Sequence, residues 1–400
     1  MIRKIKVNLF LLVTALLLTQ ALNAQISRGE VTGQLNAIQT AVPFLTIAPD
    51  SRAGAMGDAG VATSPDINSQ HWNPAKYAFI EGSGGFSLSY SPWLRNLVSD
   101  INLAYLTGYY RIDKKQVVSA SLLYFSLGNI VFTDMFANVT RNFNPNEFAI
   151  DLAYSRAFSD YISGGIAFRW IYSNLAGGVT VNGAESKPGN SFAADISTYY
   201  NRDVKLFGLN GNAGFGVNIS NIGTKVSYTD DKDPDFIPTN LRIGGIIGLD
   251  IDEFNSVALT VDLNKLLVPT PPVYWEESDT LDDGTIVTEG DIKYGMDPNV
   301  SVPVGMFQSF YDAPGGISEE FNEITYSVGL EYWYNKQFAV RGGYFHEHST
   351  KGNRKFFTMG VGLKLNVLDI DFSYLLPLHQ NHPLSNTLRF SLLFSFDPPK

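Results

Sequence analysis

The amino-acid sequence predicts an all-β protein, namely a transmembrane antiparallel β-barrel of about 14 strands with an N-terminal plug segment. Three observations lead to this prediction: apolar residues that alternate with polar ones from Gly85 onward, connections that alternate between short and long, and an unusual composition. Aromatic residues make up 13% of the 400 residues, charged residues only 17%, and there are 36 glycines. This composition fits many strands separated by turns, and it argues against a disordered chain.

The beginning of the chain has the pattern of a signal peptide. Three basic residues, Arg3, Lys4 and Lys6, come before an apolar run. That run covers residues 9–18, and Ala24 offers a small residue at the cleavage point. No later stretch reaches the roughly 18 continuous apolar residues that a membrane helix needs. We therefore expect three parts, which are a signal peptide over 1–24, a plug segment over 25–84 and a barrel over 85–400.

Period-two alternation identifies the strands, because successive side chains of a strand point to opposite faces. In residues 356–366 and 367–377, for example, apolar side chains occupy every second position, and small, polar or charged ones mostly lie between them. The segments are about 9–13 residues long, which suffices to cross a bilayer at a tilt. They lie near 85–93, 101–111, 116–127, 146–157, 161–173, 190–201, 212–221, 239–250, 254–266, 323–334, 337–346, 356–366, 367–377 and 384–396.

The connections between these segments supply the second observation. Tight turns alternate along nearly the whole chain with longer connections, of which 267–322 is the longest. Two connections are exceptions. The connection 202–211 is of medium length where a short turn is expected, and 94–100 is a modest loop where a long one is expected. Outer-membrane barrels sort their connections in this way, with short periplasmic turns and longer external loops. An even number of strands would place both ends of the chain on the periplasmic side.

Tyrosines near the strand ends indicate the level of the lipid headgroups, where an aromatic ring with a polar tip is favoured. The tyrosines in question are Tyr90, Tyr109, Tyr154, Tyr172, Tyr200, Tyr332, Tyr334 and Tyr374. The last strand, within 384–396, carries apolar and aromatic residues on one face and reaches Phe396. It resembles the C-terminal strand of bacterial outer-membrane proteins, although four residues follow Phe396.

The polar faces of the predicted strands carry charged residues that would point into a lumen. Such charges either pair with one another and with a plug, or they line a conduction path or a ligand site. We favour pairing, because unpaired buried charges are costly. The residues are Asp151, Arg169, Asp195, Asp262, Glu331, Arg341, Lys364, Asp369, Asp371 and Arg389.

Few residues suggest metal binding. His346, Glu347 and His348 could hold a metal at a loop mouth, but no further histidine or cysteine follows at zinc-like spacing. The acidic run at 230–235 lacks the glycine and the glutamate of an EF-hand loop, so that only weak calcium binding stays open. We expect no metal site and no cofactor.

A lipid hydrolase would need a serine, a histidine and an orienting carboxylate. Ser373 shares a predicted strand with Asp369 and Asp371. His379 follows in the next connection, yet nothing in the sequence determines how these groups lie, and no G-x-S-x-G motif occurs. We therefore expect a protein that is not an enzyme and has no catalytic residue.

The connection 267–322 differs from the others in composition. Prolines open it, acidic residues dominate its middle, and apolar and aromatic residues follow. A connection of this length is usually functional or disordered, and its aromatic residues favour a partly ordered external segment. It could cap the mouth of the barrel or grip a protein partner. The candidate contact residues are Tyr274, Trp275, Met306, Phe307, Phe310 and Tyr311.

A tract of small and polar residues precedes the first predicted strand. It runs from Ala48 to Phe79 and reads APDSRAGAMGDAGVATSPDINSQHWNPAKYAF. A barrel of about 14 strands encloses more space than its own side chains fill, and small residues let a backbone pack close to the inner wall. We therefore predict a plug, whose polar groups can pair with inward charges such as Arg169, Arg341 and Arg389. The predicted plug residues are Asp58, Asp66, Asn68, His71, Trp72, Asn73 and Pro74.

The same tract closely resembles the start of mature proteins of the PorV (LptO) family, and the resemblance continues to the C-terminus. These proteins are outer-membrane barrels of the Bacteroidetes type IX secretion system. More distantly, the ending Asn73-Pro74-Ala75 is similar to the N-terminal region of FadL-type fatty-acid transporters, which carry an N-terminal plug. The resemblance implies an integral protein of the bacterial outer membrane, in contact with lipid and lipopolysaccharide.

The resemblance to the PorV family also implies partners. Such proteins bind the C-terminal signal domain of secreted cargo, which they receive from the large translocon barrel. They pass it to a cell-surface complex whose sortase-like protease attaches the cargo to lipopolysaccharide. The connection 267–322 would be the natural cargo contact, and nucleic acid is not expected as a partner because the net charge is −10. Two alternatives stay open, a FadL-like transporter of hydrophobic small molecules and a lipopolysaccharide-modifying deacylase barrel.

Overall fold

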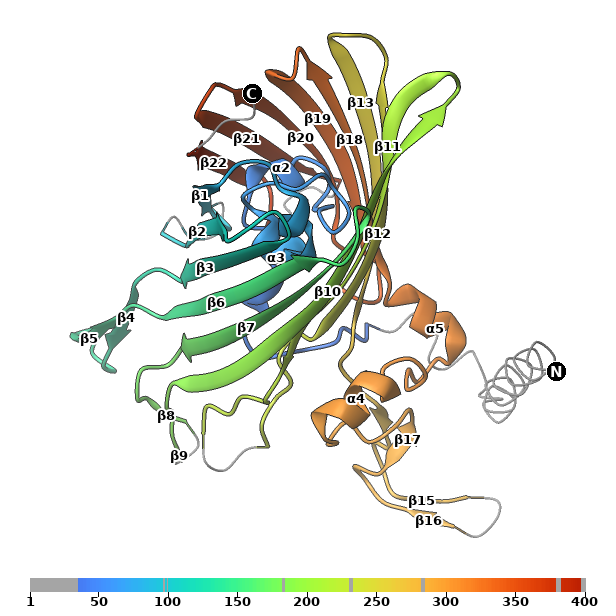
Figure 1. Ribbon diagram of the computed structural model, residues 1–400. Helices are drawn as coiled ribbons and strands as arrows, with labels where there is room; N and C mark the ends of the chain where they lie inside the picture. Colours follow the sequence, from blue (N-terminus) through green and yellow to red (C-terminus); the bar gives the residue numbers. More distant parts are fainter. Residues whose placement is uncertain are drawn as a thin grey trace, which may run out of the picture.

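A closed antiparallel barrel dominates the computed structural model, which describes residues 35–396 apart from 96, 97, 99, 182, 183, 230–232, 282–284 and 379–382 (Figure 1). Fourteen strands form the barrel, each pairs with the next along the chain, and the last pairs with the first. This confirms the predicted fold class. Among the residues that the structure describes, no helix has the length and apolar character needed to cross a membrane. The signal peptide predicted over 1–24 lies outside the described residues.

The barrel strands coincide with the alternating segments of the sequence. In each of them buried positions alternate with more exposed ones for most of the strand, as the period of two predicts. The barrel strands are β1 (Gly84–Pro92), β2 (Asn102–Arg111), β3 (Gln116–Ser126), β6 (Asn146–Ala157), β7 (Ile162–Asn174), β10 (Gly189–Leu206), β11 (Leu209–Gly223), β12 (Asn240–Asp250), β13 (Asn255–Leu266), β18 (Thr325–Tyr334), β19 (Phe338–His346), β20 (Lys355–Lys364), β21 (Leu368–Pro377) and β22 (Leu388–Ser395).

The connections alternate without exception between a short-turn rim and a long-loop rim. The medium connection that the sequence suggested over 202–211 is wrong, because β10 and β11 continue to Leu206 and Leu209. Only Phe207 and Gly208 remain between them, and both have positive φ angles, 54° and 82°. This left-handed pair is the geometry that lets two long antiparallel strands reverse without splaying apart.

The long-loop rim carries all the small elements outside the barrel, which lie at the bottom of Figure 1. The β3–β6 loop forms a hairpin, β4 (Ile130–Thr133) with β5 (Val139–Phe143), and the β7–β10 loop pairs β8 (Thr180–Val181) with β9 (Ala184–Glu185). The loop between β13 and β18 is the longest. Its elements are β14 (Val273–Tyr274), β15 (Asp279–Thr280), β16 (Ile286–Val287), β17 (Ile292–Tyr294), α4 (Val302–Gln308) and α5 (Ile317–Asn322).

Apolar side chains cover the outer wall of the barrel. Leu152, Ile166 and Phe168, for example, are 62%, 60% and 54% exposed, although each lies in the middle of a strand. Such a surface is stable only against lipid, so the outer wall is the membrane-facing side. Tyr109 is an exception to the prediction from strand-end tyrosines, because it is buried and stacks on Tyr77 inside the barrel.

The chain before β1 runs through the barrel, where Figure 1 shows it in blue. We call residues 41–80 the inner segment. Most of its residues are buried, and several of its backbone groups bond to inward side chains of the wall. Its short helices are η1 (Pro43–Thr46), α2 (Ser51–Gly54), α3 (Ser69–Trp72) and η2 (Pro74–Phe79).

The inner segment crosses the barrel from one rim to the other. Asn36 donates its backbone N–H to Thr350 O at 2.9 Å, and Ala41 donates to Phe236 O at 2.9 Å, so this end lies among the long loops. Ile80, at the other end, belongs to an apolar cluster at the short-turn rim. The sequence predicted both ends of the chain on the side of the short turns, and the two ends of the barrel sheet, at Gly84 and Ser395, do lie at the short-turn rim. Residue 36 nevertheless lies at the opposite rim, because the inner segment spans the lumen.

A test of this packing uses two adjacent glycines of β19. A Cβ at Gly343 would overlap backbone atoms of Met56 and Gly57, so Gly343→Ala is expected to reduce stability by about 1–3 kcal/mol. Gly342→Ala is the matched control, since its Cβ would meet nothing nearer than Thr358 O at 3.9 Å. Heat-dependent gel mobility of the detergent-solubilised barrel measures the midpoint temperature of unfolding of both variants. Equal midpoints for the two variants would contradict the close approach.

Candidate functional site

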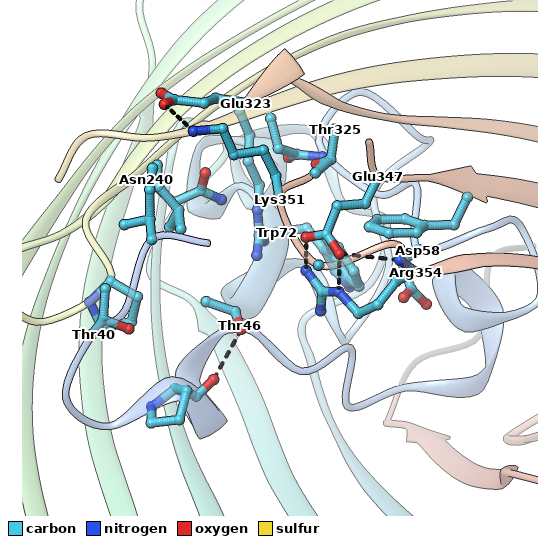
Figure 2. A pocket seen from close by; sticks show the side chains of 18 residues that line it. Thr40, Thr46, Asp58, Trp72, Asn240, Glu323, Thr325, Glu347, Lys351 and Arg354 are labelled. Carbon is cyan, nitrogen blue, oxygen red and sulfur yellow. Dashed lines mark hydrogen bonds and ion pairs between the residues drawn. The ribbon is translucent and has the colours of Figure 1, made fainter. Parts of the chain in front are cut away.

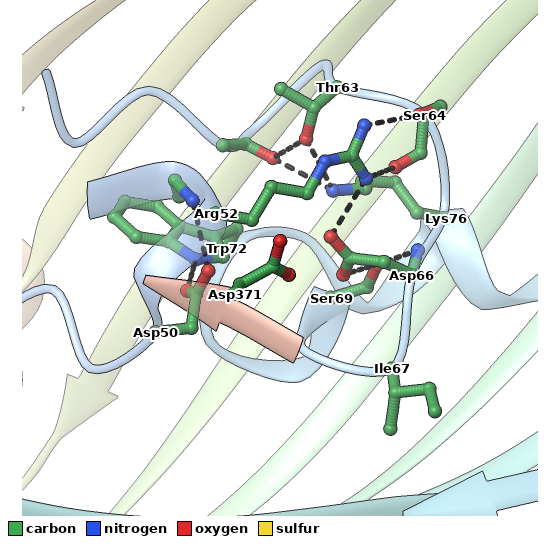
Figure 3. A network of polar contacts seen from close by, with 12 residues as sticks. Asp50, Arg52, Thr63, Ser64, Asp66, Ile67, Ser69, Trp72, Lys76 and Asp371 are labelled. Atoms are coloured by element: carbon green, nitrogen blue, oxygen red, sulfur yellow. Dashed lines mark hydrogen bonds and ion pairs between the residues drawn. The ribbon is translucent and has the colours of Figure 1, made fainter. Parts of the chain in front are cut away.

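Arg52, on α2, joins the inner segment to the barrel wall. Its Nη1 donates to Asp66 Oδ2 at 2.9 Å within the segment (Figure 3). Its Nε and Nη2 donate to Glu331 Oε2 at 3.0 Å and to Glu331 Oε1 at 2.8 Å. The Arg52 side chain is only 9% exposed, so water and salt screen these ion pairs weakly. The inner segment is therefore tied to β18 by a bidentate, charge-assisted contact.

The carboxylate of Glu331 continues this network along the wall. It also accepts a hydrogen bond from Arg341 Nε at 2.7 Å, and Arg341 faces it directly across the β18–β19 pair. Arg341 Nη1 in turn donates to Asp371 Oδ1 at 2.5 Å on β21. All four charged groups are buried. Alternating charges thus link α2, β18, β19 and β21, and Glu331 is shared by two guanidinium groups.

Asp50 organises the inner segment itself. Its Oδ2 accepts from Ala53 N at 2.9 Å as the N-cap of α2, and its Oδ1 accepts from Trp72 Nε1 at 2.6 Å (Figure 3). One carboxyl group therefore connects α2 to α3 across an otherwise irregular stretch.

Two further charged side chains hold the backbone of the inner segment. Asp262 Oδ2, on β13, accepts from Gly60 N at 2.7 Å and from Val61 N at 2.9 Å. Lys76 Nζ donates to Gly60 O and to Thr63 Oγ1, both at 2.9 Å. The irregular backbone around residue 60 therefore has side-chain partners on both its N–H and its carbonyl groups.

Arg169, on β7, pairs only within the wall. Its Nε donates to Asp151 Oδ1 at 2.6 Å on β6, and its Nη2 donates to Asp195 Oδ2 at 3.2 Å on β10. Its Nη1 contacts the side-chain oxygen of Asn221 on β11. Asp151 lies directly opposite Arg169 in the strand register. This cluster ties four neighbouring strands together.

The contacts of the predicted plug residues differ in part from the pairing that the sequence suggested. Asp58 Oδ1 lies 3.4 Å from Arg389 Nη2, which is a contact between the inner segment and one of the inward charges. Asp66, however, pairs with an arginine of its own segment. Arg169 and Arg341 pair with carboxylates of the wall instead, because neighbouring strands already place acidic groups beside them.

The other predicted plug residues are all buried in the inner segment. Asn73 donates from Nδ2 to Thr198 O at 3.0 Å on the wall. Pro74 begins η2, and its carbonyl accepts from Ser155 Oγ at 2.6 Å. Asn68 has no hydrogen-bond partner for its side-chain amide among the described residues. Backbone and neutral groups therefore make most contacts of this part of the segment.

Sequence reasoning missed five buried basic residues of the described chain: Arg52, Lys76, Arg242, Lys265 and Lys351. Arg52 and Lys76 are the only lysine or arginine residues of the tract 48–79, and a lone basic residue among small ones is a usable signal, because a buried charge needs partners. Arg242 occupies an inward position of β12 and donates from Nη1 to the carbonyl oxygen of His71 at 3.2 Å. The alternation of its strand would have assigned it to the lumen.

Two lumen-facing charges, Lys364 and Asp369, and two residues considered for a lipid hydrolase, Ser373 and His379, remain to be placed. Lys364 and Asp369 lie opposite each other beside the short turn between β20 and β21. Ser373 Oγ is buried and has no hydrogen-bond partner among the described residues. His379 lies outside the described residues, so its position relative to Ser373 stays a prediction.

The suggested metal ligands have other contacts. Glu347 accepts from Arg354 Nη2 at 2.8 Å, and His346 Nδ1 lies 3.0 Å from the Tyr344 hydroxyl. His348 Nδ1 contacts Thr350 at the tip of the same loop. Across the described residues, no group of three or more metal-binding side chains comes together. Half of the acidic run at 230–235 lies outside the described residues.

Ion pairs fasten α5 of the longest loop to the barrel rim. Lys265 Nζ, at the end of β13, lies 2.9 Å from Glu320 Oε2 and 2.6 Å from Glu323 Oε2. Lys351 Nζ, in the β19–β20 loop, lies 2.5 Å from Glu319 Oε1 and 3.0 Å from Glu323 Oε1. The longest loop is thereby anchored at α5 to two other parts of the rim.

The α4 end of this loop exposes aromatic side chains. Phe307, Phe310 and Tyr311 are 74%, 49% and 64% exposed. The opposite side of α4 packs against the rim, because a Cβ at Gly305 would lie 2.8 Å from Phe236 Cζ. We call Phe307, Phe310 and Tyr311 the loop aromatic patch. Met306, the neighbouring candidate residue, is only half-exposed and is therefore left out of the patch.

The two other candidate contact residues lie elsewhere in the loop. Tyr274 belongs to the β14–β17 pair and is exposed. Trp275 follows it, and the ammonium group of Lys293 lies 4.4 Å from its ring centroid. A cation over the ring face occupies part of the surface that a partner would use. Lys265 Nζ likewise lies 5.9 Å from the ring centroid of Phe310, but no described cation lies over Phe307 or Tyr311. The loop aromatic patch is therefore the better candidate for protein contact.

Breaking the shared carboxylate tests the network at Arg52. Glu331→Gln would leave two buried guanidinium groups short of a counter-charge, so we expect a loss of about 3–5 kcal/mol of stability. Arg52→Gln combined with Glu331→Gln should cost less than the sum of the single changes, because the pair is removed together. Urea-dependent unfolding measures the free energy of unfolding of the unchanged protein, of each single variant and of the double variant. Glu253→Gln, at an exposed turn, is the control, and additive effects would contradict a direct pair.

A pH test concerns Asp312 in the longest loop, whose Oδ2 accepts from Thr270 N at 3.1 Å. Burial raises the pKa of Asp312 to about 7, so the folded loop favours the neutral carboxyl. Its stabilising contribution is fully present below pH 3.8, the ordinary pKa, and is lost as pH rises through about 7. Hydrogen exchange over 302–322, corrected for intrinsic rates, should be faster at high pH. Asp312→Asn should remove that difference, and an unchanged pH dependence would contradict this role.

The solved structures that this chain is similar to include two toluene transporters and a FadL homologue. The toluene transporter TodX of Pseudomonas putida is 10% identical, with 90% of this chain and 98% of that chain covered and a TM-score of 0.45. The toluene transporter TbuX of Ralstonia pickettii is 11% identical (88% and 98% covered, TM-score 0.45). A FadL homologue of Pseudomonas aeruginosa is 10% identical (90% and 99% covered, TM-score 0.42). At these identities the similarity says nothing of what this chain binds.

A comparison with protein families gives a match over residues 30–273, which is more than half of the chain. The matched family is described as type IX secretion system protein PorV. No curated protein sequence matches. The matched residues include the inner segment and the strands from β1 to β13. Together with the closed barrel and its apolar outer wall, this places the protein in the outer membrane as an integral component. The chain belongs to the PorV family of the type IX secretion system.

Proposed function

We propose that this protein carries cargo within the type IX secretion system. It binds the C-terminal signal domain of secreted cargo, receives it from the large translocon barrel, and passes it to the sortase-like attachment complex at the cell surface. The observation that carries the proposal is the loop aromatic patch at the long-loop rim. In an outer-membrane barrel this rim faces the outside, where cargo is handed over.

The patch has the properties of a protein-binding surface. Aromatic side chains are enriched at the energetically dominant positions of interfaces, and a cluster of them exposed to water is costly unless it is covered by a partner. The patch lies beside α5, which Lys265 and Lys351 hold against the rim. A surface on an anchored segment loses less conformational entropy on binding than one on a free loop.

The proposed role involves no covalent chemistry by this chain. A carrier needs a surface that binds cargo reversibly and that leaves room for the next component to engage. Residues of the longest loop, which the rim holds in place, can meet both needs without a nucleophile or a metal. We accordingly propose that the protein is not an enzyme and that its partner complexes perform the signal removal and attachment.

Replacing the patch tests the cargo contact. Phe307→Ser, Phe310→Ser and Tyr311→Ser together should weaken binding of a purified cargo signal domain at least about tenfold, since two or three aromatic anchors are lost. The matched control changes Met135 and Phe136 to serine. These residues are 90% and 78% exposed in the β3–β6 loop of the same rim. Equal affinity of the patch variant and the control, with both barrels assembled, would overturn the assignment of the patch.

A native pull-down from outer membranes, followed by mass spectrometry, tests the wider role. Co-purification of the translocon barrel and of cargo with its signal domain is the expected result. Recovery of lipid alone, with no secretion component, would contradict the carrier role. The patch variant serves as an internal comparison, because it should lose cargo while the barrel itself stays in the membrane.

A further inference from the structure

A cavity of about 310 Å³ lies between the inner segment and the long-loop rim (Figure 2). Asp58 and Trp72 of the inner segment line it, together with Arg242, Phe345 and Arg354 of the wall and rim. This volume lies at the lower end of the range found for small-molecule sites. The cavity is distinct from the loop aromatic patch, none of whose residues lines it.

Arg242 is the least compensated charge of the cavity wall. Arg242 is 6% exposed, and Nη1 makes its one hydrogen bond among the described residues, to the carbonyl oxygen of His71 at 3.2 Å. The guanidinium carbon lies 4.9 Å from the centroid of the Trp72 ring. No carboxylate of the described residues forms an ion pair with Arg242. A buried cation in this situation is costly unless an anion completes its surroundings.

The nearest charged groups are paired with each other. Glu347 accepts from Arg354 Nε at 2.9 Å and from Arg354 Nη2 at 2.8 Å, as Figure 2 shows. Asp58 lies 3.4 Å from Arg389 Nη2. The charged residues that line the cavity are three acidic ones, Asp58, Glu323 and Glu347, and three basic ones, Arg242, Lys351 and Arg354. Of the three basic residues, Arg242 alone forms no ion pair among the described residues.

More distant acidic groups have partners of their own. Asp262 accepts from two backbone N–H groups of the inner segment, and Asp195 pairs with Arg169 in the wall. Glu323, on the cavity rim, pairs with Lys351, which also lines the cavity. None of these carboxylates lies within ion-pair distance of Arg242 among the described contacts.

Neutral polar groups and aromatic rings complete the cavity. Asn240 precedes Arg242 by two residues on the same face of β12. Asn264 lies opposite Arg242 on β13. Trp72 and Phe345 supply apolar surface. A planar guanidinium, amide side chains and rings in one small space suit a carboxylate on a compact apolar body.

We propose that this cavity binds a small organic monocarboxylate, whose carboxylate pairs with Arg242 and whose apolar body packs against Trp72 and Phe345. One carboxylate would supply the ion pair that Arg242 lacks among the described residues. A neutral ligand would leave Arg242 without an ion pair. Because the loop aromatic patch takes no part, this site stands apart from the proposed cargo contact.

The test uses the full-length barrel in a neutral detergent, with phenylacetate as the probe and its neutral isostere phenylacetamide as the comparison. Isothermal titration should show that phenylacetate binds at least about tenfold more tightly than phenylacetamide. Arg242→Gln should abolish this preference. Arg202→Gln, at an exposed position near the opposite rim, is the matched control and should bind as the unchanged protein does.

Equal binding of the acid and the amide, or an unchanged preference in Arg242→Gln, would overturn the proposal. Arg242→Lys guards against a failure of the glutamine variant to assemble, because it keeps the charge but lacks the planar fork. It should retain the preference for phenylacetate with a weaker affinity. Affinity for phenylacetate that is identical in Arg242→Lys and the unchanged protein would also contradict a guanidinium–carboxylate contact.

Discussion

A wide lumen lined by charged side chains is the constraint on which the rest of this structure depends. Fourteen strands enclose more space than their inward side chains fill, and buried charges cannot be left without partners. The inner segment meets both requirements. Its backbone approaches the wall closely where Gly343 removes the obstacle of a Cβ, and Arg52 reaches Glu331 at 2.8 Å. Because Glu331 also binds Arg341, the inner segment and the wall stabilise each other through one carboxylate.

The same segment makes the two rims different. At the short-turn rim, Tyr77 and Ile80 pack with Tyr109 in an apolar cluster. At the long-loop rim, the segment leaves a cavity beside Arg242, and the longest loop is fastened above the rim through Lys265. Both proposed binding surfaces therefore lie on the external side of the membrane. This asymmetry suits a protein that meets its partners at the cell surface.

Much of the fold was predictable, because barrel strands impose a period of two and membrane insertion sorts the connections by length. The inward direction of Asp151, Arg169 and Glu331 followed from that period alone. The partners of these charges did not follow. Arg341 on β19 binds Asp371 on β21, although β20 lies between the two strands. Only strand order and strand tilt decide that these two side chains meet. The place of Tyr109 was not predictable either, because its ring stacks inside the barrel on Tyr77 of the inner segment.

The sequence by itself determined the closed β-architecture, the apolar outer wall and the presence of a small-residue tract suited to the lumen, because these depend on local periodicity and composition. Its likeness to one family also pointed to secretion. Only the tertiary structure decided that residue 36 lies at the long-loop rim, that Arg52 shares a carboxylate with Arg341, and that Arg242 faces a cavity without a counter-ion. Each of these depends on groups far apart in the chain, which meet only when the barrel closes around the inner segment.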